Sequence, residues 1–254
     1  MKYRYFIFIS YRGTEYHGWQ VQPNSLTVQE ILDGSLSRLL REEISTTGAG
    51  RTDTGVHALV FCAHFDSASG NLDTDAQLKF RLNRFLPKDI TVTDIRHVVG
   101  DANARFNALS RTYKYYISIL KDPFSIESSW YLHGSPDVEK MNAAAEILFR
   151  HTDFTSFSKL HTDVKTNNCT IIEAFWEDKK DKLVFTIKAN RFLRNMVRSI
   201  VGTMVDIGFG KKSLEDFENI ILARDRSMAG FSAPAKGLYL TAIDYPEDIF
   251  VKKL

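Results

Sequence analysis

The chain has 254 residues, of which 44% are hydrophobic and 25% are charged. This composition is typical of a globular protein with one large or two small domains and a core that needs neither disulfides nor metals. The 33 basic and 31 acidic side chains leave a net charge of only +2, so bulk charge alone does not indicate a nucleic-acid partner.

Two cysteines, Cys62 and Cys169, stand in apolar runs without the spacing of a metal site. No signal-peptide pattern is recognisable, and no apolar run approaches the ~20 residues of a membrane span. We therefore expect a protein of the cytoplasm that does not contact a membrane.

The first half of the chain predicts three strands and two helices. Thr27 and Glu30 have capping-box spacing before a run of apolar residues at helical period, and Pro87 ends a second such run. Aromatic and β-branched residues predict the strands. The expected strands cover residues 3–11, 58–66 and 90–98, and the expected helices cover 28–40 and 78–86.

The second half repeats this order of elements. Its expected strands cover residues 111–120, 169–176, 182–189 and 238–245, and its expected helices cover 138–149, 193–207 and 213–223. With a further short strand expected before Gly48, each half roughly follows the order β-α-β-β-α-β of a split βαβ unit. We therefore expect an α+β fold, with two fused ferredoxin-like halves around a central, mainly antiparallel sheet. The N-terminal half would span residues 1–104 and the C-terminal half 105–254.

The segment Gly48 to His57 reads Gly-Ala-Gly-Arg-Thr-Asp-Thr-Gly-Val-His, and we call it the Asp53 loop. Glycines allow tight turns and close approach of the backbone to a ligand. Arg51 would favour the charged form of Asp53. Because a fixed, ionised carboxylate suits a nucleophile or a base, Asp53 is the leading catalytic candidate.

Three other interpretations of the loop compete. A phosphate-binding P-loop would end in Gly-Lys-Ser/Thr, which is absent. Asp53-Thr54-Gly55 resembles the triplet of aspartic proteases, but two such aspartates must share a proton, so a dimer would be required and Arg51 would oppose it. The third is a structural turn in which Asp53 caps a helix or accepts from backbone N–H groups.

Basic residues interleave with aromatic residues between Arg105 and Tyr115. Cations suit phosphates and rings stack on bases, so this stretch favours a nucleic-acid ligand. In a strand, Tyr113 and Tyr115 would face one side and Lys114 the other. A half-buried strand with core tyrosines is the structural alternative.

A third cluster follows residue 190. Arg191, Arg194 and Arg198 are spaced i, i+3 and i+7 and would share one face of the predicted helix. Such a stripe can bind a phosphate backbone or hold a carboxylate. A solvated basic face is the alternative.

Taken together, these segments resemble the tRNA pseudouridine synthase A family. The stretch 50–58 is similar to the catalytic motif of that family, and further motifs match in order along nearly the whole chain. They are Tyr11-Arg12-Gly13-Thr14, Gly18-Trp19-Gln20, Asn83-Arg84-Phe85-Leu86-Pro87, Ala104-Arg105-Phe106, Arg111-Thr112-Tyr113-Lys114-Tyr115, Asp153-Phe154-Thr155-Ser156-Phe157, Asn195-Met196-Val197-Arg198 and Gly237-Leu238-Tyr239-Leu240.

The resemblance implies an isomerase that converts uridine to pseudouridine on the 3′ side of the anticodon stem-loop of tRNA. Asp53 would be the nucleophile, and Arg51 would help to flip the base and fill its place. Tyr113 would stack on the uracil, and Arg198 would pair with Asp53 and keep it ionised. No metal or organic cofactor is implied.

The resemblance further implies a homodimer with RNA lying across both subunits. Besides Tyr113, we expect Arg105, Arg191, Arg194 and Leu240 to bind the RNA. A catalytically silent tRNA-binding module on the same scaffold is the alternative.

The sequence departs from the family pattern in four places. Arg12 stands where Asp is usual, Thr54 where Ala is usual, and Val60-Phe61 where Gly-Gln is typical. Residues 165–169 lack an arginine often found there. These departures leave the expected catalytic groups in place and bear on how the RNA docks.

Overall fold

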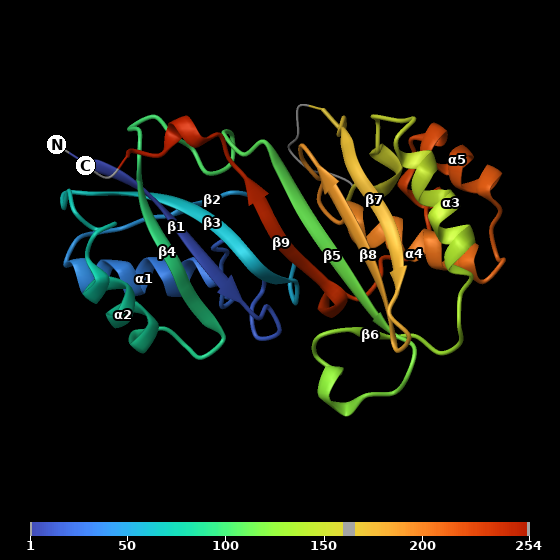
Figure 1. Ribbon diagram of the computed structural model, residues 1–254, viewed down its shortest axis with the longest axis horizontal. Coiled ribbons are helices and arrows are strands. Elements are labelled where there is room, and N and C mark those ends of the chain that lie inside the picture. Colours follow the sequence, from blue (N-terminus) through green and yellow to red (C-terminus); the bar gives the residue numbers. More distant parts are fainter. Residues whose placement is uncertain (1, 160–165, 253–254) are drawn as a thin grey trace. The chain divides into compact units, whose positions relative to one another are not determined.

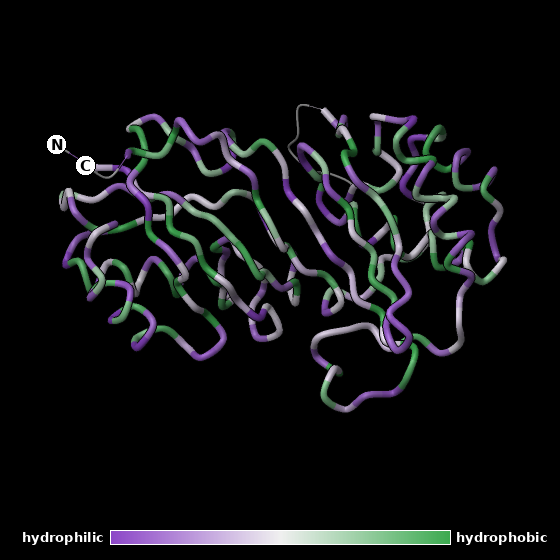
Figure 2. The backbone as a smooth tube through the Cα atoms, viewed as in Figure 1, coloured by the Kyte–Doolittle hydropathy of each residue, from purple (hydrophilic) through white to green (hydrophobic). Residues whose placement is uncertain are grey.

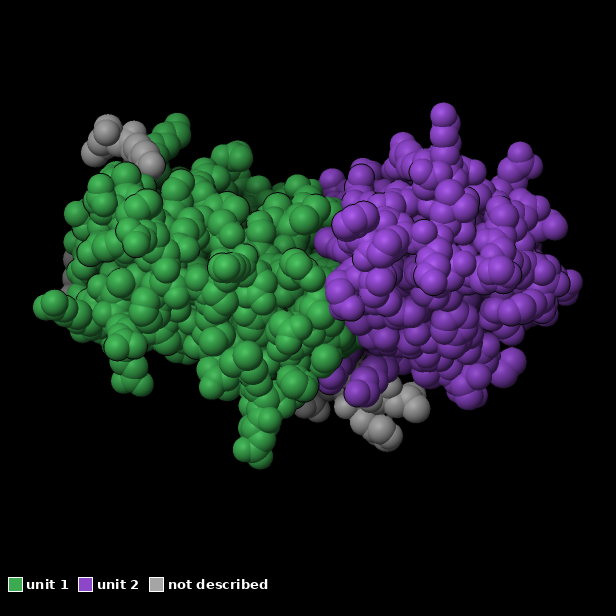
Figure 3. Space-filling view, turned by 90° about the horizontal axis from the view of Figure 1, so that it is seen from below, with its two compact units in different colours: residues 1–109, 240–254 green, residues 110–239 purple. Residues whose placement is uncertain are grey.

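The computed structural model describes residues 2–159 and 166–252 (Figure 1). Within them the chain is a mixed α and β structure with five α-helices and mainly antiparallel strand pairing, as predicted. It divides into two compact units (Figure 3), one of residues 1–109 with 240–254 and one of residues 110–239. Lys165, one of the departures from the family pattern, lies outside the described residues.

The first unit is a sheet with two helices. β1 lies between β3 and β4 and runs antiparallel to both, while the short β2 pairs with β3. The elements are β1 (Tyr3–Tyr11), α1 (Val28–Leu40), β2 (Thr47–Gly48), β3 (His57–Ser67), α2 (Ala76–Phe85) and β4 (Ile90–Val98). Residues 240–244 of β9 (Leu238–Asp244) also belong to this unit.

Strand β1 lies in the core of this unit, because Tyr5, Phe6 and Ile7 are fully buried and consecutive side chains of a strand point to opposite faces. The Phe6 ring meets the rings of Tyr245 and Phe250, with centroids 5.0 and 6.0 Å away. The Val251 N–H donates to the His97 carbonyl at 3.0 Å. These contacts explain why the C-terminal segment belongs with the first unit.

The two helices of this unit lie side by side (Figure 1). As predicted, Thr27 caps α1 and accepts from the Glu30 N–H at 3.3 Å. Their apolar stripes are fully buried, and each buried leucine contributes about 1.5–3 kcal/mol. The stripes comprise Leu32 and Leu36 of α1 and Leu78 and Leu82 of α2.

The second unit is likewise built from a sheet and helices. β8 lies between β5 and β7, antiparallel to both, and β6 runs briefly parallel to β5. Helix α3 packs against β7 and α4. The elements are β5 (Ser110–Ser118), β6 (Trp130–Tyr131), α3 (Val138–Leu148), β7 (Ile171–Asp178), β8 (Lys182–Ala189), α4 (Met196–Gly208) and α5 (Leu214–Ala223).

Helix α4 begins three residues later than the predicted start at Leu193. The residue before it, Asn195, has φ 69°, a left-handed conformation that cannot lie inside a helix. The hydrophobic spacing continues through this turn, so the sequence pattern extended the helix too far. Helix α5 begins as predicted, with Ser213 and Asp216 forming a capping box.

Candidate active site

The Asp53 loop runs from β2 into β3, and aromatic packing fixes its first residues. The Ala49 N–H donates to the Cys62 carbonyl at 2.8 Å. The buried rings of Trp19 and Phe61 have centroids 4.2 Å apart. A Cβ added to Gly48 would lie 2.4 Å from Trp19 Nε1 and 2.8 Å from Phe61 Cζ. Glycine is therefore required where the loop begins.

Hydrogen bonds from residues 11–16 hold the remainder of the loop. The Gly13 N–H donates to His57 Nδ1 at 3.0 Å, and the Gly55 N–H donates to the Tyr16 carbonyl at 3.3 Å. The Tyr11 hydroxyl and Thr52 Oγ1 share a buried hydrogen bond of 2.9 Å. Leaving a buried polar group unpaired costs about 1–3 kcal/mol, so these bonds fix the backbone on both sides of Asp53.

Residues 11–18 and the Asp53 loop lie so close together that glycine is needed in both. A Cβ on Gly13 would lie 2.0 Å from the Val56 carbonyl oxygen. A Cβ on Gly18 would lie 2.2 Å from the Thr52 oxygen, and its φ of +87° also disfavours a side chain. Gly55 has φ +78°. The glycines of the family-like motifs thus serve contact between the segments.

Asp53 itself lies in the outer turn of the loop. Its carbonyl accepts from the Val56 N–H at 3.1 Å. The Asp53 side chain is partly exposed and that of Arg51 is exposed. The loop leads into a strand, so the interpretation of Asp53 as a helix cap is wrong. A rigid backbone that carries a partly exposed carboxylate is the preorganised arrangement that a nucleophile or base requires.

The departures from the family pattern fall at different depths around this loop. Arg12 and Thr54 are exposed. Phe61 is fully buried, and its ring also meets that of Tyr11 at 5.7 Å. Phe61 is therefore part of the packing beneath the loop, whereas Arg12 and Thr54 face solvent.

Tyr113 and Tyr115 of β5 have different surroundings although they alternate with Lys114 as predicted. Tyr115 is fully buried and its hydroxyl donates to the Pro234 carbonyl at 2.7 Å. Burial raises the pKa of Tyr115 well above its ordinary value. Tyr113 is half-buried, and its ring packs edge-to-face with that of Phe192, with centroids 5.1 Å apart. Tyr115 is thus a core residue, and Tyr113 keeps surface for a ligand.

Arg198 lies in the first turn of α4 and is tied to a neighbouring segment. Its Nε donates to the Ala233 carbonyl at 2.6 Å, and the Ala233 N–H donates back to the Arg198 carbonyl at 3.0 Å. A Cβ on Gly202 would lie 2.0 Å from the Phe231 oxygen, so the segment lies directly on the helix. The half-buried guanidinium is therefore held in one orientation.

The predicted arginine stripe is wrong as a helix face. Arg191 and Arg194 precede the first residue of α4, so neither shares a helix face with Arg198. Arg191 is half-buried and Arg194 is exposed. The left-handed turn at Asn195, which delays the start of the helix, is the physical reason.

The remaining expected RNA-binding residues lie in the first unit. Arg105 is exposed in a turn whose N–H groups at Arg105 and Phe106 donate to Asn103 Oδ1 at 2.9 and 3.2 Å. The Phe106 side chain is 78% exposed and lies beneath the Arg105 guanidinium. Leu240 is only 3% exposed in β9.

Sequence reasoning did not identify the groups that position the loop. Tyr11 and Thr52 are 41 residues apart, and Gly13 and His57 are 44 apart. Periodicity reports only on neighbours along one element, so it could not pair them. The recurrence of glycine and tyrosine in residues 11–18 was the available signal.

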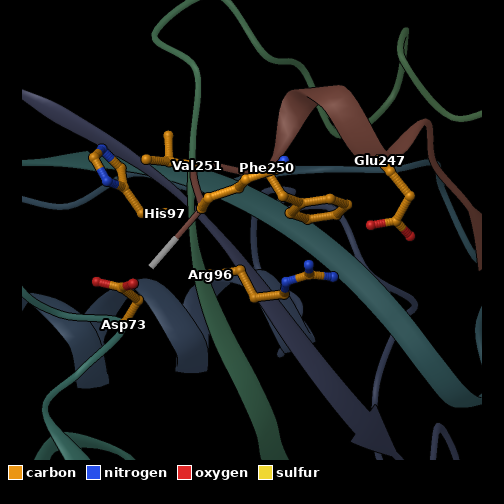
Figure 4. A pocket seen from close by; sticks show the side chains of 7 residues that line it. Asp73, Arg96, His97, Glu247, Phe250 and Val251 are labelled. Atoms are coloured by element: carbon orange, nitrogen blue, oxygen red, sulfur yellow. The ribbon is translucent and has the colours of Figure 1, made fainter. Parts of the chain in front are cut away.

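A pocket of the first unit contains none of the candidate residues. It has a volume of about 260 Å³ and lies near the C-terminal segment (Figure 4). The Arg96 guanidinium lies 3.5 Å from the centroid of the Phe250 ring there. Its wall carries both acids and bases, so its charge does not indicate one class of ligand. It is lined by Asp73, Arg96, His97, Glu247, Phe250, Val251 and Lys252.

Both cysteines are buried free thiols, and burial raises the pKa of Cys169 to about 11. Among the described residues, no cluster of His, Cys, Asp or Glu is arranged to hold a metal ion. No helix in residues 2–159 and 166–252 is long and apolar enough to cross a membrane.

Comparison with known proteins places these observations in a family. The family model described as tRNA pseudouridine synthase matches residues 7–107 and 144–246. A protein of Bacteroides fragilis named tRNA pseudouridine synthase A is 52% identical over 248 residues, covering 97% of this chain and 98% of the relative. A protein of the same name from Bacteroides thetaiotaomicron is 53% identical, covering 97% and 92%.

More distant relatives carry the same name. One from Exiguobacterium sibiricum is 36% identical over 239 residues, covering 94% of this chain and 95% of the relative. A solved structure of a dye-decolorizing protein from V. cholerae aligns at 9% identity over 96% of this chain and 94% of that one, but its TM-score of 0.20 carries no fold argument. The extent and identity of the matches show that this chain belongs to the tRNA pseudouridine synthase family.

Proposed function

We propose that this protein converts uridine to pseudouridine in tRNA. The reaction breaks the N1–C1′ glycosidic bond, rotates the uracil and forms a C5–C1′ bond. The C5 proton goes to solvent and N1 gains a proton, so no oxidant or reductant is consumed. The observation that carries the proposal is Asp53, on a loop fixed by buried hydrogen bonds, in a chain about half identical to proteins named tRNA pseudouridine synthase A.

Four residues have proposed roles in the reaction. Asp53 is the nucleophile and Arg51 assists base flipping, which costs a few kcal/mol for a base inside a stem. Tyr113 stacks on the flipped uracil, and the guanidinium of Arg198 supplies a positive charge to the active site. Their settings support these roles, because Arg51 is exposed, Asp53 and Tyr113 are partly exposed, and Arg198 is held by Ala233.

The proposed substrate region is the 3′ side of the anticodon stem-loop, bound by a homodimer in the cytoplasm. Arg105, Arg191 and Arg194 contact phosphates. Arg105 and Arg194 are exposed and Arg191 half-buried, which supports this role. We further propose that Leu240 lines the site from β9.

The finer fold assignment belongs to the same proposal. Two ferredoxin-like halves, residues 1–104 with the Asp53 loop and 105–254 with Tyr113 and Arg198, would divide the catalytic residues between them. The strand order β4-β1-β3-β2 of the first unit supports such a half.

Tritium release from tRNA that contains 5-tritiated uridine tests the activity and its location together. The parent protein should release tritium from unmodified tRNA. It should release none when the uridines on the 3′ side of the anticodon stem-loop are replaced by cytidine. Release that is insensitive to this replacement would contradict the proposed location, and tight binding without release would indicate a silent binding module.

The proposed phosphate contacts have a separate test. Replacing Arg191 or Arg194 by glutamine should weaken tRNA binding and reduce the slope of log K against log salt by about 0.7–0.9 for each contact. An unchanged slope would contradict the assignment for that arginine.

A further inference from the structure

Helix α2 exposes an unusual combination of charge and aromatic surface. Between Ala76 and Lys88 the sequence has four basic residues and no acid. The Phe80 side chain is 56% exposed and that of Phe85 is 46% exposed. Figure 2 shows hydrophobic and hydrophilic residues mixed along this helix. Large exposed rings on a charged helix are more typical of a binding surface than of a solvated face.

These side chains form one continuous surface. Leu78 and Leu82 are the buried residues of α2. At 100° per residue, Phe80, Arg84, Arg81 and Phe85 follow one another around the exposed part of the helix. The Arg84 guanidinium lies over the Phe80 ring at 5.8 Å, and Arg38 of α1 lies over Phe85 at 5.6 Å. We name Arg38, Phe80, Arg81, Arg84 and Phe85 the α2 cationic face.

The α2 cationic face is rigidly mounted. Asn83 donates through Nδ2 to the Val92 carbonyl at 2.9 Å and accepts from the Val92 N–H through Oδ1 at 2.7 Å. These two bonds clamp α2 to strand β4. The rings and guanidinium groups are therefore presented on a fixed helix, as recognition of a defined ligand requires.

Most of the positive charge of this face is uncompensated. Arg81 forms an exposed ion pair with Asp75 at 3.3 Å, which contributes little. Within residues 2–159 and 166–252, Arg38 and Arg84 take part in no ion pair. Their guanidinium groups, which lie over the rings, keep their planar donors available for an anion.

We propose that the α2 cationic face binds the phosphate backbone of the substrate tRNA, which rests on the proposed function. Guanidinium groups match phosphate oxygens in forked hydrogen bonds. Phe80 and Phe85 add surfaces on which an unpaired base or a sugar can pack. A second copy of the chain fits less well, because a two-fold contact would place like charges against each other.

The double variant Arg38→Gln with Arg84→Gln tests the charge. Losing two phosphate contacts should reduce the salt slope by about 1.4–1.8 and weaken tRNA binding about 10–30-fold at 0.15 M salt. Turnover at saturating tRNA should equal that of the parent. The control variant Lys180→Gln with Lys211→Gln removes two exposed charges elsewhere and should leave both quantities unchanged.

A second variant separates stacking from charge. Phe80→Ala should weaken tRNA binding but keep the salt slope of the parent, since stacking releases no counterions. If the double variant is folded, as judged by thermal unfolding, and keeps the Kd and the salt slope of the parent, the proposal is overturned. A shift in oligomeric state measured by light scattering, without a change in slope, would identify the face as a contact between copies. A parent protein that fails to bind tRNA at all would instead contradict the proposed function itself.

Discussion

Replacing Gly13 by alanine should displace the Asp53 loop without touching Asp53. The added Cβ would lie 2.0 Å from the Val56 carbonyl oxygen, about 1.4 Å short of ordinary contact, and the backbone on both sides would have to move. Such overpacking costs about 1–3 kcal/mol, which lowers the Tm of a protein of this size by about 2–4 °C per kcal/mol. A misplacement of about 1 Å at a reacting group can reduce turnover about 100-fold.

Two other glycines provide matched controls for this experiment. Gly50 lies in the same loop and Gly34 lies in α1, and a Cβ at either meets nothing within 4 Å. Gly50→Ala should keep the Tm of the parent, and Gly34→Ala should gain about 0.5–1 kcal/mol from helix propensity. Thermal unfolding and tritium release are measured on all three variants. If Gly13→Ala has the Tm and the turnover of the parent, the contact between residues 11–18 and the Asp53 loop does not position Asp53.

Two further predictions concern the supports of this unit. Tyr11→Phe removes the 2.9 Å hydrogen bond to Thr52 Oγ1. Denaturant unfolding should show that the free energy of unfolding falls by about 1–3 kcal/mol, because the threonine oxygen stays buried. A fall of less than about 0.5 kcal/mol would mean that the bond is dispensable. Burial raises the pKa of Asp33 from its ordinary 3.8 to about 6, while Thr46 donates two hydrogen bonds to it. The contribution of Asp33 to the free energy of unfolding, measured as the difference between the parent and Asp33→Asn, is therefore fully present below pH 3.8. It is lost as the pH rises through about 6. A stability difference between parent and variant that stays constant from pH 4 to pH 7 would refute this.

Much of the fold could be predicted because local patterns determine it. Strand β4 and strand β8 have the predicted bounds, and α1 begins at the predicted cap Thr27. These elements bury regular stripes, which leave a periodic trace in the sequence. The start of α4 could not be predicted, because the left-handed turn at Asn195 lies within a continuing apolar pattern. Strand β6, with two residues, is too short to carry a pattern at all.

The candidate site was only partly predictable for a related reason. The Asp53 loop is unusual in composition, so its residues stand out in the sequence. Its rigidity comes from contacts across about 40 residues, such as Gly13 to His57, and only the folded structure reveals them. The α2 cationic face has the same origin, since Arg38 reaches Phe85 from another helix.

The central claim is that Asp53 performs the isomerisation. It is tested most directly by tritium release from tRNA containing 5-tritiated uridine, with the parent protein and Asp53→Asn compared at saturating tRNA. The parent should release tritium, and the variant should release none while it binds the tRNA with the affinity of the parent. Equal release by the two proteins would show that Asp53 is not the nucleophile.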